Sequence, residues 1–230
     1  MKIQPKFFAA ATCAAFAWGN AATAEVKIAL DSAPDLESSG TYVWAHTFAN
    51  HLNDNGIEAV EFERDALGDE AERLDQVSQG LLEVSMSDLN SAASINSLAN
   101  GLSLPYFFNS SEEVDAALHD GGMMDAINDG TLPEGVRVAD GYVNPSWVPI
   151  LFGHTGFIRH FTDAKIVYSF RAALISEDWY SGLSDEDRAI VDEGIELATA
   201  ANREFLEGQE KVLGELRAAG VEVVELTDEA

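Results

Sequence analysis

Apolar and polar residues along the first half of the chain favour strands and helices in turn. Apolar positions run nearly continuously or alternate over residues 26–32, 57–62 and 81–87, which is typical of strands. Between these segments, residues 40–56 and 69–79 have apolar positions near helical spacing. Strands that alternate with helices predict a parallel sheet with helices on both of its faces.

Turn and capping residues mark where these helices begin and end. Gly56 and Gly80 follow the two helical stretches and are typical C-terminal stops. Asp69 is followed three residues later by Glu72, which is the pattern of a capping box. A shorter helix is predicted over residues 88–100.

The second half of the chain continues with strands and one long helix. Strand-like segments cover residues 104–108, 135–143, 166–176 and 221–226, and an acidic helix of unusual length covers residues 184–219. The strand-like run from residue 166 directly follows a polar turn, without a glycine, proline or spacer between them. This abrupt junction is the least ordinary feature of the pattern.

The charge of the chain narrows the range of its partners. Its 230 residues are enough for one large domain or two small lobes with a core. There are 40 acidic and 13 basic residues, which give a formal net charge of −27. This excess argues against nucleic acids and anionic membrane surfaces as partners. Because the acids are spread along the chain, they favour a solvated acidic surface over an acidic binding face.

Residues 1–24 have the features of a secretory signal peptide. Lys2 and Lys6 precede an apolar stretch, and Ala22 and Ala24 stand at cleavage spacing. The stretch is too short for a membrane span, and a buried N-terminal helix is the structural alternative. Cleavage after Ala24 predicts a periplasmic protein that has lost its single cysteine and therefore folds without a disulfide.

Polar residues that directly follow the first and third strands are candidates for ligand binding. In sheets of this kind, small ligands bind beyond the carboxyl ends of the strands. A helix cap or a turn is an equally good explanation for each of these residues. They are Asp31, Ser32, Ser87, Asp88 and Asn90.

The sequence contains no common motif for catalysis, a cofactor or a metal. Glycine-rich nucleotide loops, a G-x-S-x-G elbow, H-E-x-x-H and C-x-x-C are all absent. His46 and His51 are five residues apart, so a helix would not place them on one face as metal ligands. We therefore predict no cofactor and no metal site, and an enzymatic function has no support from the sequence.

Four segments, taken in order, match the pattern of one protein family. They are DALGDEAERLDQVSQGLLEVSMSD at 65–88, LSLPYFF at 102–108, EDWYSGLSDEDRAIVDEG at 177–194 and LRAAGVEVVEL at 216–226. Together they resemble the solute-binding proteins of tripartite ATP-independent periplasmic (TRAP) transporters, the DctP-like family. The resemblance implies an α/β fold of the periplasmic binding protein type II, with a mixed or parallel sheet, flanking helices and a long C-terminal hinge helix. It also implies a receptor, not an enzyme, that delivers a small organic acid to the permease subunits in the membrane.

The resemblance also offers an explanation for the junction at residue 165. In the family, a stretch similar to 159–165 is followed by most of the second lobe before a strand similar to 166–176. On the order of 80–100 residues are therefore expected to be missing, which leaves the second lobe incomplete. We assign 25–165 to the first lobe and the start of the crossover, and 166–230 to the crossing strand, long helix and final strand. The chain ends where family members continue into another helix.

The resemblance places further residues in the cleft. Cleft positions of the first lobe correspond to Asp31, Asp69, Ser87 and Asp88. The family's arginine for a substrate carboxylate belongs to the missing strand, and Arg159 and Arg171 near the junction do not match its motif. Arg171 also fits a solvent-facing or ion-paired role. Carboxylates suit such a cleft only if they accept hydrogen bonds from hydroxyl or amine groups of the ligand, or order water.

Two other functions compete with the receptor. A truncated copy could be a remnant that no longer binds solute, or a periplasmic scaffold that uses an exposed sheet to associate with itself or another protein. An exported hydrolase is the weakest alternative, because no nucleophile–base pair is visible. Titration with organic acids separates the receptor from the remnant, and turnover of esters tests the hydrolase.

Overall fold

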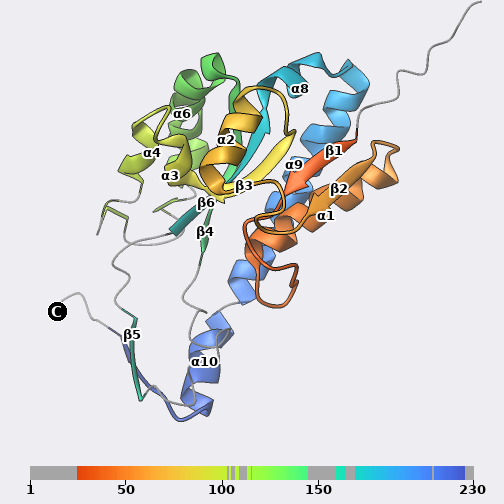
Figure 1. The fold of residues 1–230 in the computed structure, drawn as a ribbon. Coiled ribbons are helices and arrows are strands. Elements are labelled where there is room, and N and C mark those ends of the chain that lie inside the picture. Colours follow the sequence, from red (N-terminus) through yellow and green to blue (C-terminus); the bar gives the residue numbers. More distant parts are fainter. Residues whose placement is uncertain are drawn as a thin grey trace, which may run out of the picture.

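The computed structural model has a five-stranded sheet with the strand order β2–β1–β3–β6–β4 (Figure 1). It describes residues 25–102, 104, 107–108, 113–114, 116–144, 159–163, 169–208 and 210–225. The strands of this sheet are β1 Val26–Ala29, β2 Ala59–Phe62, β3 Val84–Asp88, β4 Val136–Asn144 and β6 Ser169–Ser176. The three strands predicted in the first half of the chain therefore form neighbouring strands of one sheet.

The sheet is mixed, which is one of the two forms expected. β1 pairs in parallel with β2 and β3, whereas β6 pairs antiparallel with both β3 and β4. β6 departs from the parallel pattern because of the place where the chain re-enters the sheet. It follows β5 (His160–Asp163), which lies beyond the carboxyl end of β3, so β6 starts at that end and runs back (Figure 1).

Helices cover both faces of the sheet. α1 (Gly40–Asp54) and α9 (Asp185–Gly208) pack on one face. The other face is covered by α2 Glu70–Ser78, α3 Leu89–Ala92, α4 Leu98–Gly101 and α6 Met123–Thr131. The remaining helical segments are η1 Ala116–Asp120, η2 Leu132–Glu134, α8 Glu177–Gly182 and α10 Glu210–Ala218.

The two layers of helices explain the apolar run of β6. Ala173 and Ile175 belong to the core beside α1 and α9, whereas Ala172 and Leu174 belong to the core on the opposite face. All four side chains are fully buried. A strand that is covered on both faces needs apolar residues at successive positions, not only at alternate ones.

α1 and α9 pack closely, which joins the start of the chain to its last quarter. A Cβ added at Gly194 of α9 would lie 3.0 Å from Cδ2 of Phe48, so only a glycine fits there without displacing its neighbours. The side-chain amide of Asn202 donates a hydrogen bond to the carbonyl oxygen of Gly40 at 2.7 Å. The long helix is therefore packed directly against the beginning of the first lobe.

The predicted helix ends are confirmed. Asp69 caps α2 in a capping box with Glu72. Gly56 and Gly80, which follow α1 and α2, have φ angles of 83° and 70°, a conformation that glycine adopts without strain.

Other segments depart from the predicted bounds. The region 88–100 contains the two short helices α3 and α4 in place of one helix. In the segment 104–108, the described residues Leu104, Phe107 and Phe108 lie outside any strand. The long helix is divided into α9 and α10, and residue 209 between them is outside the described residues.

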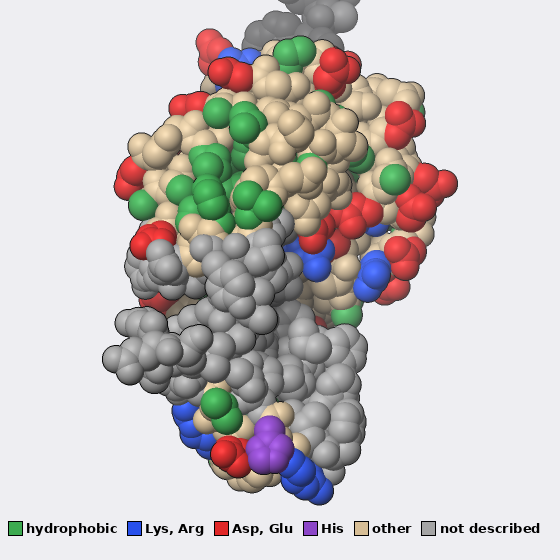
Figure 2. All heavy atoms as spheres, turned by 90° about the vertical axis from the view of Figure 1, so that its left-hand side faces the viewer, with side chains coloured by type: hydrophobic (Ala, Val, Ile, Leu, Met, Phe, Trp, Pro, Cys, Tyr) green, Lys and Arg blue, Asp and Glu red, His purple; other side chains and the backbone are tan. Residues whose placement is uncertain are grey.

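β5 and β7 (Glu222–Glu225) form a separate parallel two-stranded sheet at the other end of the molecule, next to α10 (Figure 1). In Figure 2 acidic side chains lie mainly along the rim and the right-hand side of the face, and hydrophobic side chains gather on its upper left part. Within the described parts of the chain, no helix has the length and apolar character needed to cross a membrane. The predicted signal peptide lies outside the described residues.

Candidate functional site

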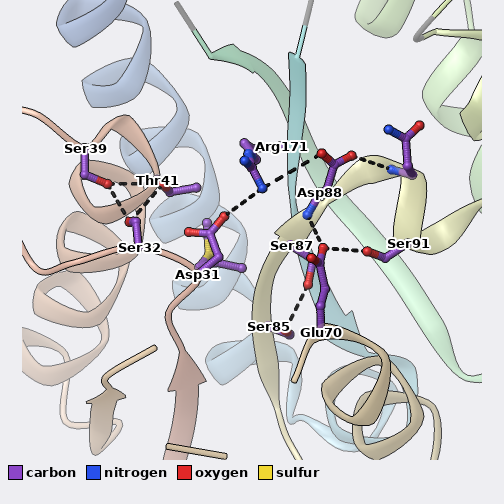
Figure 3. A network of polar contacts seen from close by, with 12 residues as sticks. Asp31, Ser32, Ser39, Thr41, Glu70, Ser85, Ser87, Asp88, Ser91 and Arg171 are labelled. Atoms are coloured by element: carbon purple, nitrogen blue, oxygen red, sulfur yellow. Dashed lines mark hydrogen bonds and ion pairs between the residues drawn. The ribbon is translucent and has the colours of Figure 1, made fainter. Parts of the chain in front are cut away.

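A polar cluster lies where the carboxyl ends of β1 and β3 meet the beginning of β6 (Figure 3). Asp31 follows β1, Asp88 ends β3, and Arg171 stands opposite Asp88 on β6. Nη1 of Arg171 lies 3.5 Å from Oδ2 of Asp31 and 3.9 Å from Oδ2 of Asp88. The antiparallel pairing of β6 with β3 thus places one guanidinium beside two carboxylates from neighbouring strands.

Asp31 is the most buried member of this cluster. Its side chain is 7% exposed, compared with 28% for Arg171 and 29% for Asp88. Burial raises the pKa of the Asp31 carboxyl, and the Arg171 charge and the Thr41 hydroxyl offset only part of that rise. Within the described residues, Oδ1 of Asp31 and Nε of Arg171 are buried without a hydrogen-bond partner. Both members of the ion pair therefore keep one buried polar atom unsatisfied.

Hydroxyl groups hold the loop after β1 against the start of α1. The Ser32 hydroxyl lies 2.6 Å from Oγ of Ser39 and 3.2 Å from Oγ1 of Thr41. Ser39 in turn caps α1, because its Oγ accepts a hydrogen bond from the backbone N–H of Tyr42 at 3.1 Å. Ser32 therefore anchors the chain segment that carries Asp31 (Figure 3).

Asp88 combines a capping role with its place in the cluster. Its Oδ1 accepts a hydrogen bond from the backbone N–H of Asn90 at 2.9 Å and so caps α3. Its Oδ2 is the oxygen that faces Arg171. Glu70 of α2 accepts hydrogen bonds from the backbone N–H of Asp88 and from the hydroxyl of Ser91. Glu70 thus brings a third carboxylate next to the cluster.

A buried arginine supports β3 from below and was not predicted. Arg73 of α2 is only 3% exposed. It donates hydrogen bonds to Ser85 Oγ at 3.1 Å, to the Gly68 carbonyl oxygen at 3.1 Å and to the Met86 carbonyl oxygen at 3.2 Å. The buried hydroxyl of Ser87 lies 3.0 Å from that of Ser85. Ser87 therefore belongs to a hydrogen-bonded layer within the core beneath the cluster.

The structure does not bring all eight predicted residues together. Asp31, Asp88 and Arg171 form the cluster, and Ser32, Ser87 and Asn90 lie next to it in sequence. Asp69 is exposed, and its carboxylate accepts the backbone N–H of Glu72 as a helix cap. Arg159 is exposed beside the two-stranded sheet, where its carbonyl oxygen accepts the backbone N–H of Glu222.

The chemistry that this cluster can supply is recognition by charge and hydrogen bonding. In the described part of the chain, no three His, Cys, Asp or Glu side chains are grouped to hold a metal ion. A separate hollow of about 400 Å³ lies beside β4 and α9, and none of the eight predicted residues lines it. Its lining includes His119, Ala139, Ile195, Glu196, Thr199 and Arg203.

The strand order, the antiparallel β6 between β3 and β4, the helices on both faces and the long α9 define a lobe of the periplasmic-binding-protein type. The family model for bacterial extracellular solute-binding proteins of family 7 (DctP) matches residues 37–138 and 136–230. The chain belongs to this family, whose members are receptors rather than enzymes. The resemblance seen in the sequence is thereby confirmed.

Solved structures of TRAP periplasmic solute-binding proteins share the fold. An open apo structure from Rhodobacter sphaeroides is 14% identical with a TM-score of 0.77, over 89% of this chain and 88% of that one. One from Roseobacter denitrificans with bound L-galactonate is 15% identical with a TM-score of 0.70, over 90% of both chains. One from Ochrobactrum anthropi, with its C-terminus bound in the ligand pocket, is 16% identical with a TM-score of 0.75, over 89% and 84%. No curated protein matches the sequence.

Proposed function

We propose that the chain is an extracytoplasmic receptor that binds a small organic acid at the cluster of Asp31, Asp88 and Arg171 and delivers it to a TRAP-type permease. Membership of the solute-binding family supports the general role. The observation that carries the ligand class is Arg171, a guanidinium held at the carboxyl edge of the sheet with its Nε unpaired within the described residues. Guanidinium groups bind carboxylates through parallel, charge-assisted hydrogen bonds.

The neighbouring residues have distinct parts in this proposal. Asp31 and Asp88 orient the guanidinium from two sides and accept hydrogen bonds from the ligand. Ser32 and Ser87 act through the backbone, because the hydroxyl of Ser32 fixes the loop after β1 and that of Ser87 lies in the layer beneath β3. Structures of similar fold hold carboxylic acids, such as D-erythronate in the protein from Polaromonas.

Titration calorimetry of residues 25–230 with small hydroxy, amino and unsubstituted carboxylic acids tests this function. We expect saturable binding of at least one acid, and a loss of at least about tenfold in affinity for Arg171→Gln, because a charge-assisted contact is lost. Arg137→Gln is the matched control: Arg137 is also a strand arginine with 28% side-chain exposure and a carboxylate partner, but it lies outside the cluster. Equal losses in both variants would contradict the proposal.

Export and delivery belong to the same proposal. Expression of the full chain with its first 24 residues should yield a periplasmic protein that begins at Glu25, which intact-mass measurement detects. Uptake of the bound acid by vesicles that contain the permease subunits should require this protein. A protein that binds the acid but does not stimulate uptake would limit its role to binding.

A non-binding remnant or scaffold is the second candidate, and one observation favours it. The described residues outside the five-stranded sheet and its helices form only the two-stranded sheet β5–β7 and α10. In this reading the residues 166–230 retain the crossing strand and the hinge helix without a complete second lobe. Light scattering separates the two, since a scaffold self-associates without ligand and a receptor binds acid as the same species.

A further inference from the structure

Two unsatisfied atoms in the cluster point to the kind of ligand it accepts. Oδ1 of Asp31 is a hydrogen-bond acceptor, and Nε of Arg171 is a donor. Both are buried without a hydrogen-bond partner among the residues that the structure describes. They belong to the two sides of one ion pair, in which Nη1 of Arg171 lies 3.5 Å from Oδ2 of Asp31. Such orphaned atoms are rare in native proteins and call for a partner beyond the described residues, and a bound ligand is one.

Figure 3 shows how the acceptor is placed. The Asp31 carboxylate lies between Arg171 and Thr41, with Oδ2 toward Arg171 and the other oxygen on the Thr41 side. The Thr41 hydroxyl lies 3.2 Å from both Ser32 Oγ and Ser39 Oγ, within a group of three hydroxyls. The Thr41 hydroxyl offsets part of the pKa rise of Asp31 but makes no hydrogen bond to Oδ1, so an N–H or O–H donor of a ligand would satisfy that oxygen.

The balance of charges favours a positively charged donor. Asp31 and Asp88 both face the same nitrogen of Arg171, and Glu70 is bound to the backbone of Asp88. Arg73 is the second cation near Asp31. Three carboxylates and two guanidiniums leave this described group with one net negative charge. A ligand with two negative charges is repelled by it, whereas an ammonium group is attracted.

We propose, on the basis of the receptor function above, that the ligand is a zwitterion: a small carboxylate that carries an ammonium group. Its carboxylate accepts from Arg171 and its ammonium donates to Asp31, while Asp88 keeps the guanidinium in place. This arrangement satisfies both orphaned atoms at once and adds no net charge to an acidic site. Simple dicarboxylates and phosphate esters are disfavoured, in contrast to the sn-glycerol 3-phosphate bound to the structural relative from Fusobacterium nucleatum.

Matched sets of acids test this proposal by calorimetry at pH 7.5 and low salt. Each set contains an amino acid, the hydroxy acid and the unsubstituted acid of one carbon skeleton, such as alanine, lactate and propionate, or aspartate, malate and succinate. We expect the amino member of the binding set to bind at least tenfold more tightly than the unsubstituted member. Asp31→Asn should reduce that preference to less than threefold. Glu177→Gln, which removes an ion-paired carboxylate outside the cluster, should leave the preference unchanged.

A comparison on the unaltered protein keeps the test valid if the Asp31 variant does not fold. The N-trimethylated form of the binding amino acid retains the positive charge but lacks N–H donors, and it should bind at least tenfold more weakly. If an unsubstituted acid or a dianion binds as tightly as the amino member, the zwitterion proposal is overturned while the receptor function stands. If no acid of any kind binds to folded protein, both proposals fail.

Discussion

Two strand arginines at opposite ends of the five-stranded sheet have the same exposure but different surroundings. Arg137 lies near the amino end of β4, where its Nε donates to Oε2 of Glu177 at 2.8 Å and its guanidinium lies 4.3 Å from the centre of the Tyr180 ring. Arg171 faces two carboxylates at 3.5 and 3.9 Å, and its Nε has no hydrogen-bond partner in the described structure. Both side chains are 28% exposed.

The difference separates an ion pair that stabilises the fold from one that suits a ligand. At Arg137, the guanidinium makes a charge-assisted hydrogen bond to Glu177 and lies over the aromatic ring of Tyr180. Both partners belong to the protein itself. At Arg171 the distances to the carboxylates are longer, and Nε has no hydrogen-bond partner among the described residues. Its partner Asp31 is buried, which disfavours the ionised form of that carboxyl. Unsatisfied polar atoms and shifted pKa values are typical of functional sites. Three substitutions test this contrast.

Replacement of Arg73 by Met should have the largest effect, because it removes the support beneath the cluster at the Arg171 end. Three hydrogen bonds, to Ser85, Gly68 and Met86, would be lost from a side chain that is 3% exposed. We expect the free energy of unfolding to fall by about 3–5 kcal/mol, as measured by urea denaturation. Arg64→Met is the control, since the Arg64 side chain is 67% exposed and its loss should change stability by less than about 0.5 kcal/mol. A change below about 1 kcal/mol in the Arg73 variant would show that the hydrogen-bonded layer is not needed.

The substitution Glu177→Gln should weaken the fold by an intermediate amount. It removes the charge from a 2.8 Å hydrogen bond to Arg137 whose partners are 28% and 23% exposed. We expect a loss of about 1–2 kcal/mol in the free energy of unfolding, partly screened by salt. Glu193→Gln serves as control, because Glu193 is 67% exposed and 3.9 Å from His51 Nε2. If the Glu177 variant were as stable as the unaltered protein, the Arg137–Glu177 ion pair would not stabilise the fold, and its distinction from the Arg171 ion pairs would be lost.

The substitution Asp31→Asn should have the smallest effect and the opposite sign. The pKa of Asp31 is raised above its ordinary value of 3.8, chiefly by burial, so its ionised form is less favourable in the folded state than in the unfolded state. The penalty is absent at acidic pH, where both states are protonated, and grows as pH rises above about 4. We therefore expect the Asn variant to melt at a slightly higher temperature than the unaltered protein at pH 7 and at an equal temperature near pH 3. The melting temperatures of both proteins, measured from pH 3 to pH 7, test this prediction. A lower melting temperature for the Asn variant at pH 7 would contradict it.

Sequence patterns predicted Asp31 and Asp88 because strand ends can be located locally. Both residues follow an apolar run and precede a helix, and the structure places them at one edge of the sheet. For Asp69 the local pattern predicted a helix cap, which the structure confirms, whereas the family resemblance placed the residue in the cleft. Asp88 has both roles, so a capping pattern alone does not exclude membership of the cluster.

The partners of Arg171 could not be predicted in this way, because they depend on a register between distant strands. Asp88 and Arg171 face each other only because β6 enters antiparallel to β3. Arg73 was missed because an arginine on a short, charged helix is usually exposed. The signal that could have found it is the pair Ser85 and Ser87 within a buried strand, since buried hydroxyls need hydrogen-bond partners.

The position of β6 also governs the order in which the molecule can assemble. Until residues 169–176 have been made, β3 has an open edge, and α1 lacks the helix α9 that covers it. Val84 pairs with Ile175, and the Gly40 carbonyl oxygen accepts a hydrogen bond from Asn202, so both contacts form only after the second half of the chain has been made. The core is therefore completed by contacts between segments that are distant in the sequence. Contacts of this kind form slowly, and an open strand edge can pair with another chain. A newly made chain therefore exposes an open strand edge until its second half has been made, and aggregation competes with folding during that interval.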